Sequence, residues 1–75
     1  MRFFFDYTKK DTSLYDYRGD EFVNSKAAID FATEIAFNLK YSLTNDWMGW
    51  FIEVRNAEGT KFCSLSVDAV EHLAA

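Results

Sequence analysis

Apolar side chains recur every three or four positions over residues 25–43, the spacing of one face of an α-helix. Asn24 or Ser25 can cap this helix, because each side chain offers an oxygen to the unpaired N–H groups of the first turn. A polar stretch then breaks the pattern, so the helix is expected to end between residues 43 and 45. The stripe that must be buried consists of Ala28, Phe31, Ala32, Ile35, Ala36, Leu39 and Leu43.

Alternating patterns before and after this helix predict four strands, over residues 2–7, 14–17, 47–55 and 61–67. The first strand carries aromatic side chains on both faces, which is typical of a central strand. Polar segments that contain turn-forming residues separate the strands. Gly49 falls inside the third strand and indicates a bulge or a close backbone approach there.

These elements predict a single α+β domain over residues 1–75, with the order ββαββ and a short helix at residues 69–74. We expect a four-stranded antiparallel sheet in the order 2-1-3-4, covered on one face by the central helix, because every neighbouring pair is then antiparallel. A sheet with the fourth strand beside the first fits the same pattern. The sheet face that meets the helix would carry Phe3, Phe5, Trp50, Ile52 and Val54.

The composition adds a large aromatic content, with 8 Phe, 4 Tyr and 2 Trp in 75 residues. Each of these side chains buries about 150–250 Å², which compensates for the small core of so short a domain. One helix cannot cover all of this aromatic surface. The excess indicates that the domain associates with itself or with another protein.

The formal net charge is −4, and the longest basic run is the pair Lys9-Lys10. Nucleic-acid-binding proteins depend on a basic surface, so the charge argues against that class. A single cysteine cannot form an intramolecular disulfide, and no apolar run has the length of a signal peptide or a membrane span. These features predict a cytoplasmic protein that does not associate with a membrane.

Groups suited to catalysis or metal binding are few. His72 lies near the end of the chain, and with Asp68 it could supply two metal ligands, which do not make a site. Cys63 lies in an apolar strand, where a cysteine usually behaves as a small hydrophobic residue. The three glycines are isolated, so the chain has no phosphate-binding loop. We therefore predict that the protein is not an enzyme and that it holds no metal or cofactor.

A set of short motifs resembles a family of bacterial proteins of unknown function. The opening residues 2–6, Arg-Phe-Phe-Phe-Asp, match its R-[YF]-[YF]-F-D pattern. The resemblance extends over nearly the whole chain and implies a compact stand-alone domain, without an activity that could be transferred to any residue. Further positions that match are Asp16, Gly19, Phe22, Ala28, Ala32, Val54 and Gly59.

The far face of the predicted helix is the first candidate interaction surface. Phe37 and Tyr41 are four residues apart there, flanked by Asp30 and Glu34. Adjacent aromatic side chains on a polar face are typical of a contact surface. Alternatively, the two rings only touch each other or lie beneath the C-terminal helix.

The open face of the sheet is the second candidate, with Phe4 and Phe51 beside Arg2 and Arg55. Aromatic side chains on a sheet can stack on bases. Asp6 and the other acids on this face favour cross-strand ion pairs over a phosphate track.

Together these observations predict a small non-enzymatic protein-interaction domain that self-associates or binds a protein partner. The alternative is a module that binds a small molecule or single-stranded nucleic acid on the sheet face. A third option is a pocket for an apolar ligand beneath the aromatic segment around Trp47 and Trp50.

Overall fold

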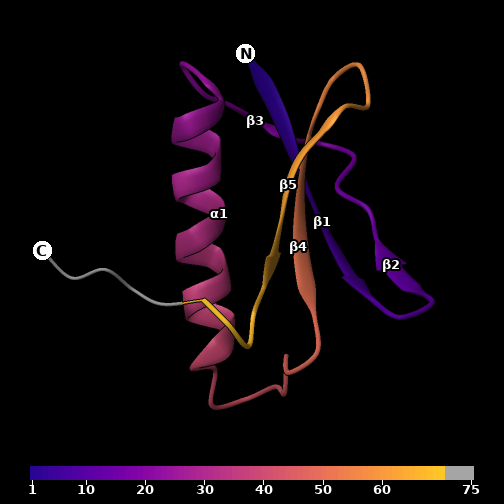
Figure 1. The fold of residues 1–75 in the computed structure, drawn as a ribbon, viewed down its shortest axis with the longest axis vertical. Coiled ribbons are helices and arrows are strands. Elements are labelled where there is room, and N and C mark those ends of the chain that lie inside the picture. Colours follow the sequence, from indigo (N-terminus) through magenta and orange to yellow (C-terminus); the bar gives the residue numbers. More distant parts are fainter. Residues whose placement is uncertain (71–75) are drawn as a thin grey trace, which may run out of the picture.

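The computed structural model describes residues 1–70 and consists of one helix packed on one face of an antiparallel sheet (Figure 1). The α+β class predicted from the sequence is confirmed, although the sheet has five strands in place of four. Within residues 1–70, no helix has both the length and the apolar character needed to cross a membrane. The elements are β1 (Arg2–Lys9), β2 (Thr12–Leu14), β3 (Asp20–Glu21), α1 (Ser25–Lys40), β4 (Phe51–Asn56) and β5 (Lys61–Ser66).

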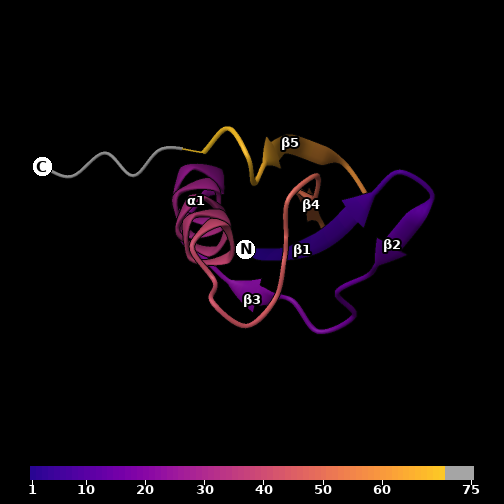
Figure 2. The same cartoon turned by 90° about the horizontal axis from the view of Figure 1, so that it is seen from below.

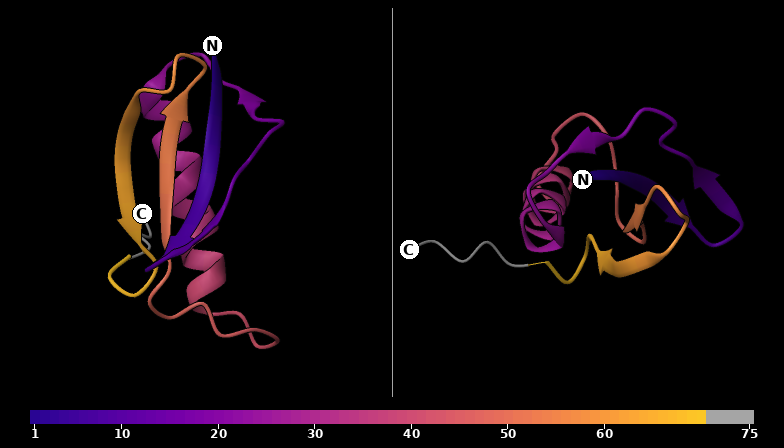
Figure 3. Two further views of the ribbon diagram at one scale, coloured as in Figure 1. Left: turned by 90° about the vertical axis from the view of Figure 1, so that its right-hand side faces the viewer. Right: turned by 90° about the horizontal axis from the view of Figure 1, so that it is seen from above.

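The main path through the sheet is β2-β1-β4-β5, and all neighbours are antiparallel (Figure 3). β1 is central, as its aromatic residues on both faces predicted. The sheet differs from the prediction in its second strand, because residues 15–17 do not belong to any strand. Two short strands pair with β1 instead: β2 lies beside its end, with Tyr7 opposite Leu14, and β3 lies beside its start, with Phe3 opposite Asp20.

The helix begins as predicted, and its N-cap is Asn24, whose Oδ1 accepts the N–H of Ala27 at 2.9 Å. The helix ends at Lys40, at least three residues earlier than predicted. The N–H of the C-cap Tyr41 bonds to the last-turn carbonyls, after which a polar segment leads away from the sheet. Leu43, the last residue of the predicted stripe, is therefore fully exposed rather than buried.

Three alanines form the buried face of α1. Ala28, Ala32 and Ala36 are completely buried, and their small side chains let the helix lie close to the sheet. Phe31 and Ile35 lie at the margin of this contact, and Phe31 keeps 42% of its surface exposed. The helix faces a core contributed by the strands and by the turn after β5, consisting of Phe3, Phe5, Ile52, Val54 and Val67.

The third predicted strand begins four residues later than expected, at Phe51. Gly49 lies in the preceding turn with φ of +84°, so its predicted place inside a strand is wrong. The register of the pairing between β4 and β5 shifts instead between Val54 and Arg55, opposite the start of β5. There the Phe62 ring packs edge-on against Phe3, with 5.6 Å between the ring centroids.

The C-terminal helix predicted over residues 69–74 is only partly within the described residues. Ala69 lies in a turn, and Val70 packs against the core without helical structure. The remainder of that segment, with His72, lies outside the described residues. The proposed pairing of Asp68 with His72 is therefore outside them as well.

Candidate functional site

The interruption between β2 and β3 leaves the middle of β1 without a neighbouring strand on that side (Figure 2). Asp16 fills this gap with its side chain. Its Oδ2 accepts the N–H of Phe5 at 3.2 Å, and its Oδ1 accepts the N–H groups of Arg18 and Gly19, both at 3.0 Å. One carboxylate thus takes the place of a strand and fixes the path of residues 15–19.

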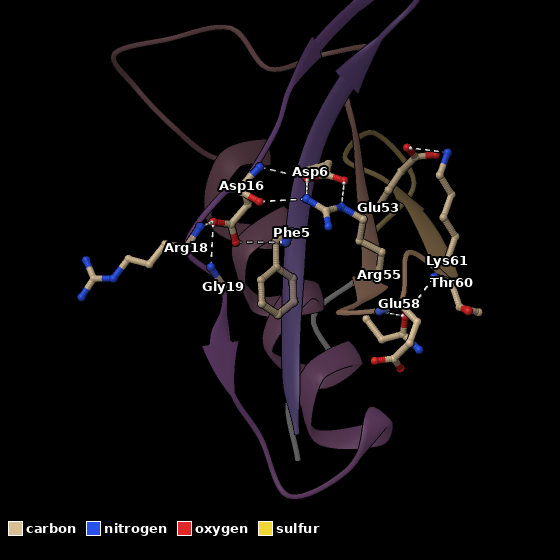
Figure 4. Close-up of polar contacts among 11 residues, drawn as sticks. Phe5, Asp6, Asp16, Arg18, Gly19, Glu53, Arg55, Glu58, Thr60 and Lys61 are labelled. Carbon is tan, nitrogen blue, oxygen red and sulfur yellow. Dashed lines mark hydrogen bonds and ion pairs between the residues drawn. The ribbon is translucent and has the colours of Figure 1, made fainter.

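A buried ion pair holds the same segment from the other face of the sheet (Figure 4). Asp6 is 2% exposed, and its Oδ2 lies 2.7 Å from the Nε of Arg55. The Asp6 Oδ1 also accepts the N–H of Asp16 at 2.9 Å, while Arg55 Nη2 donates to the Asp16 carbonyl at 2.8 Å. The guanidinium in turn lies 4.5 Å from the centroid of the Phe4 ring. Because its charge is paired and hydrogen-bonded, the Asp6 carboxylate can remain buried, while Arg55 is only half-buried.

These contacts move the pKa values of two members of the cluster. Burial alone would raise the pKa of the Asp16 carboxyl, but three backbone N–H donors and the Arg55 guanidinium hold it below its ordinary value. The hydrogen bond to Asp6 raises the pKa of Arg55, and burial opposes this only in part. Both groups therefore stay charged over the whole physiological range.

Gly19 completes the segment because no larger residue fits there. Its φ is +71°, and a Cβ atom would lie 2.8 Å from the carbonyl oxygen of Phe3 and 2.9 Å from the Phe4 ring. The spacing of Asp16 and Gly19, noted in the sequence as part of a family resemblance, thus has a structural basis: it seats residues 15–19 against β1.

A groove of about 480 Å³ lies between this segment and the helix, and it is open to solvent. Five of its nine lining residues are aromatic, and several of these rings pack edge to face. Tyr7 contacts Trp47 at 5.8 Å between ring centroids, and Phe5 contacts Phe31 at 5.4 Å. The lining residues come from β1, the segment around β2 and β3, α1 and the turn before β4: Phe5, Tyr7, Leu14, Tyr15, Asp16, Asp20, Phe31, Ile35 and Trp47.

Two carboxylates and the partly buried Tyr7 hydroxyl are among the polar groups that line the groove. Burial, with a smaller contribution from the charge of Asp16, raises the pKa of Tyr7, so its hydroxyl remains protonated. The Asp16 carboxylate is held by its backbone donors. Asp20 is exposed, and its carboxylate makes no hydrogen bond or ion pair with any residue in the described range 1–70. The groove therefore combines an aromatic lining with anionic charge.

The residues predicted on the outer helix face do lie together. The rings of Phe37 and Tyr41 are 4.9 Å apart at their centroids, and Tyr41 is exposed. Asp30 forms an ion pair with Lys26 at 2.9 Å, one turn away from Glu34. This face therefore presents one exposed ring, and Phe37 is partly buried.

The residues predicted on the sheet face also share one face, opposite α1, but both arginines there are engaged. Arg55 is paired with the buried Asp6, and Arg2 lies 3.1 Å from Glu21 and donates to the Arg18 carbonyl at 2.8 Å. Phe4 packs beneath Arg55, and Phe51 is exposed. These intramolecular contacts favour the ion-pair interpretation over a phosphate track.

Cys63 is partly buried, and burial raises the pKa of its thiol, although a hydrogen bond with the Val54 backbone opposes this. A raised pKa makes a cysteine a poorer nucleophile at neutral pH. Within residues 1–70, no group of three or more His, Cys, Asp and Glu side chains is placed to hold a metal ion.

The sequence identified only part of the groove. Trp47 belonged to the suggested apolar pocket, but Trp50 packs behind it, at 5.3 Å between ring centroids, and does not line the groove. Tyr15 and Asp20 were not singled out, because the lining is assembled from four separate segments. The one pattern that could have indicated them is an aromatic residue next to a turn that contains two aspartates.

Comparison with known proteins gives one match. A family model described as a domain of unknown function, DUF6894, matches residues 2–68. No curated protein and no solved structure matches the chain. The match runs from the start of β1 past the end of β5, and it confirms the resemblance to a family of unknown function. The chain therefore belongs to the DUF6894 family of domains of unknown function.

Proposed function

We propose that this domain is a non-enzymatic interaction module that binds a segment of a partner protein in the aromatic groove. The observation that carries the proposal is the grouping of exposed apolar side chains at the groove. Leu14, Tyr15 and Phe31 all line it and keep 50%, 57% and 42% of their surfaces exposed. Exposed apolar patches of this kind mark interaction sites on small domains, and aromatic residues are enriched in such interfaces.

The titration of the groove residues supports binding rather than catalysis. A general acid or base works best with a pKa near the pH at which the enzyme operates. The pKa of Asp16 is lowered and that of Tyr7 is raised, so both move away from neutrality. Neither group is suited to exchange a proton with a substrate at neutral pH.

The charge of the groove supports a protein partner over a nucleic acid. Asp16 and Asp20 would repel phosphate groups, and the net charge of the chain is −4. The arginines that a sheet-face site would need are held in intramolecular ion pairs. A cytoplasmic location is part of the proposal, because the partly buried Cys63 thiol is compatible with a reducing compartment.

The test uses tyrosine variants at matched exposed positions. The tagged full chain and its Tyr15→Ser and Tyr17→Ser variants are used to capture proteins from an extract of the native cells, followed by mass spectrometry. Tyr15 lines the groove, whereas Tyr17, two residues further on and 86% exposed, does not. A partner retained by the wild type and by Tyr17→Ser, but lost with Tyr15→Ser, is the expected result.

Two other results would change the conclusion. If Tyr15→Ser and Tyr17→Ser retain the same partner as the wild type, the groove is not the binding surface. A third variant, Tyr41→Ser, then tests the outer helix face, where Phe37 and Tyr41 meet. Loss of the partner with that variant alone would place the interface on the helix. Size-exclusion chromatography with light scattering shows whether the partner is a second copy.

A further inference from the structure

We infer that the groove receives the side chain of a lysine or arginine from an extended segment of a partner protein, with apolar residues on either side of it. This inference rests on the proposed function and adds the chemistry of the occupant. It comes from the placement of two carboxylates, an aromatic lining and exposed apolar side chains around one opening.

The carboxylates provide charge complementarity. Asp20 is exposed, and in the described part of the chain its carboxylate has no cationic partner. Asp16 lines the same groove, and the backbone donors that hold it favour its ionised form. The Arg55 guanidinium offsets part of the Asp16 charge, so Asp20 supplies most of the negative charge at this opening, which attracts a cation and repels an acidic segment.

The aromatic lining suits the same cation. Tyr7, Tyr15 and Trp47 line the groove, and the Tyr7 and Trp47 rings are almost perpendicular, at 87°. An ammonium or guanidinium group is attracted to the face of an aromatic ring, most strongly where water is partly excluded. The methylene groups of lysine or arginine would pack on the same rings.

The shape of the site favours a chain segment over a free amine. The groove is open to solvent rather than enclosed, so a side chain that belongs to a longer polypeptide can reach it. Leu14 and Phe31 lie at its border with half or nearly half of their surfaces exposed. Apolar residues next to the cation would cover these side chains, and a small amine would leave them in water.

The experiment selects random-sequence peptides displayed on phage against the full chain. The expected result is enrichment of lysine or arginine at one position with apolar neighbours. An enriched peptide is then made in two forms, one with the basic residue and one with norleucine at that position. Both are titrated into the protein labelled with ¹⁵N, and the indole N–H of Trp47 and the amide of Tyr15 report binding.

Charge removal in the protein gives the matched comparison. Asp20→Asn removes a free carboxylate at the groove, and Glu58→Gln removes an exposed carboxylate in the β4–β5 turn, away from it. We expect Asp20→Asn to lower the affinity for the basic peptide by about threefold to tenfold and Glu58→Gln to leave this affinity unchanged. The affinity for the wild type should fall as the salt concentration rises.

The outcomes separate this inference from the proposed function. If the norleucine peptide binds as tightly as the basic one at the same groove amides, the groove binds apolar segments, and only the inference fails. If n-butylamine alone shifts these signals at the same concentration as the peptide, the groove binds small amines. The inference that it receives a segment of a partner protein is then wrong. Selection of acidic peptides overturns the inference directly. If selection enriches no peptide that perturbs the groove, the proposed function and the inference fail together.

Discussion

The Oδ2 atom of Asp16 lies 3.2 Å from the backbone nitrogen of Phe5, where one edge of β1 faces the gap between the short strands β2 and β3. A side chain here replaces a neighbouring strand. The arrangement allows residues 15–19 to leave the ladder and form one wall of the groove while the N–H of β1 stays satisfied. An unsatisfied buried backbone donor would destabilise the sheet.

Asp16→Ala should therefore lower the free energy of unfolding by about 1–3 kcal/mol, since it leaves three backbone N–H groups without their acceptor. Urea denaturation followed by tryptophan fluorescence measures the change. Asp11→Ala, in the exposed turn between β1 and β2, is the control and should change stability by less than about 0.5 kcal/mol. Equal stability of the two variants would show that the Asp16 contacts contribute nothing.

The lowered pKa of Asp16 also predicts how stability depends on pH. A carboxyl group whose pKa is lower in the folded protein stabilises it above the ordinary value of 3.8, and this contribution is lost as the pH falls through the folded value. The unfolding free energy of the wild type should thus decrease more steeply below pH 5 than that of Asp16→Asn. Denaturation curves between pH 3 and pH 7 test this, and parallel curves for the two proteins would contradict it.

Gly19→Ala and Gly59→Ala form a matched pair of substitutions. Both glycines have positive φ, +71° and +88°, so both variants bear the same backbone penalty, roughly 1–2 kcal/mol. A Cβ at Gly19 would also clash with the Phe3 carbonyl oxygen at 2.8 Å, whereas no atom of residues 1–70 lies within 4 Å of one at Gly59. Thermal unfolding should show a clearly larger loss of stability for Gly19→Ala. A similar loss for both variants would mean that residues 15–19 can shift away from β1 without destabilising the protein.

Arg55→Met leaves the carboxylate of Asp6 buried without its cation, so we expect a loss of about 3–5 kcal/mol. Lys61→Met breaks the exposed ion pair with Glu53, 3.4 Å apart, and should cost less than about 1 kcal/mol. Combining Arg55→Met with Asp6→Leu should recover part of the loss, because the unpaired charge is then removed. Chemical denaturation of the three variants checks the order, and a double variant less stable than Arg55→Met would contradict the argument.

The fold followed from the sequence wherever one physical pattern determined an element. The apolar stripe predicted the helix and its buried alanines, although Phe31 and Leu43 of that stripe are exposed. The aromatic residues on both faces of β1 predicted its central place in the sheet. The second strand was not, because Tyr15 and Tyr17 alternate as in a strand while the decisive contact is the hydrogen bond from Phe5 to the Asp16 side chain. A propensity pattern carries no signal for a carboxylate that replaces a strand.

The candidate site was less predictable than the fold. Asp6 and Arg55 are 49 positions apart. The acids beside the arginines on the open sheet face predicted cross-strand ion pairs, but they did not indicate that Asp6 is buried. The groove depends on how far α1 lies from residues 15–20, which tertiary packing alone decides. Sequence periodicity indicates which side chains face inward, but not the space left between elements.

The alanine row of α1 has a consequence for the dimensions of the groove. Because Ala28, Ala32 and Ala36 set the distance from the helix axis to the sheet, they also set how far Phe31 stands from Tyr7 across the opening. A larger side chain in this row would move the helix outward and widen the groove without altering any residue of its lining. Three buried positions that do not line the groove can therefore determine its width.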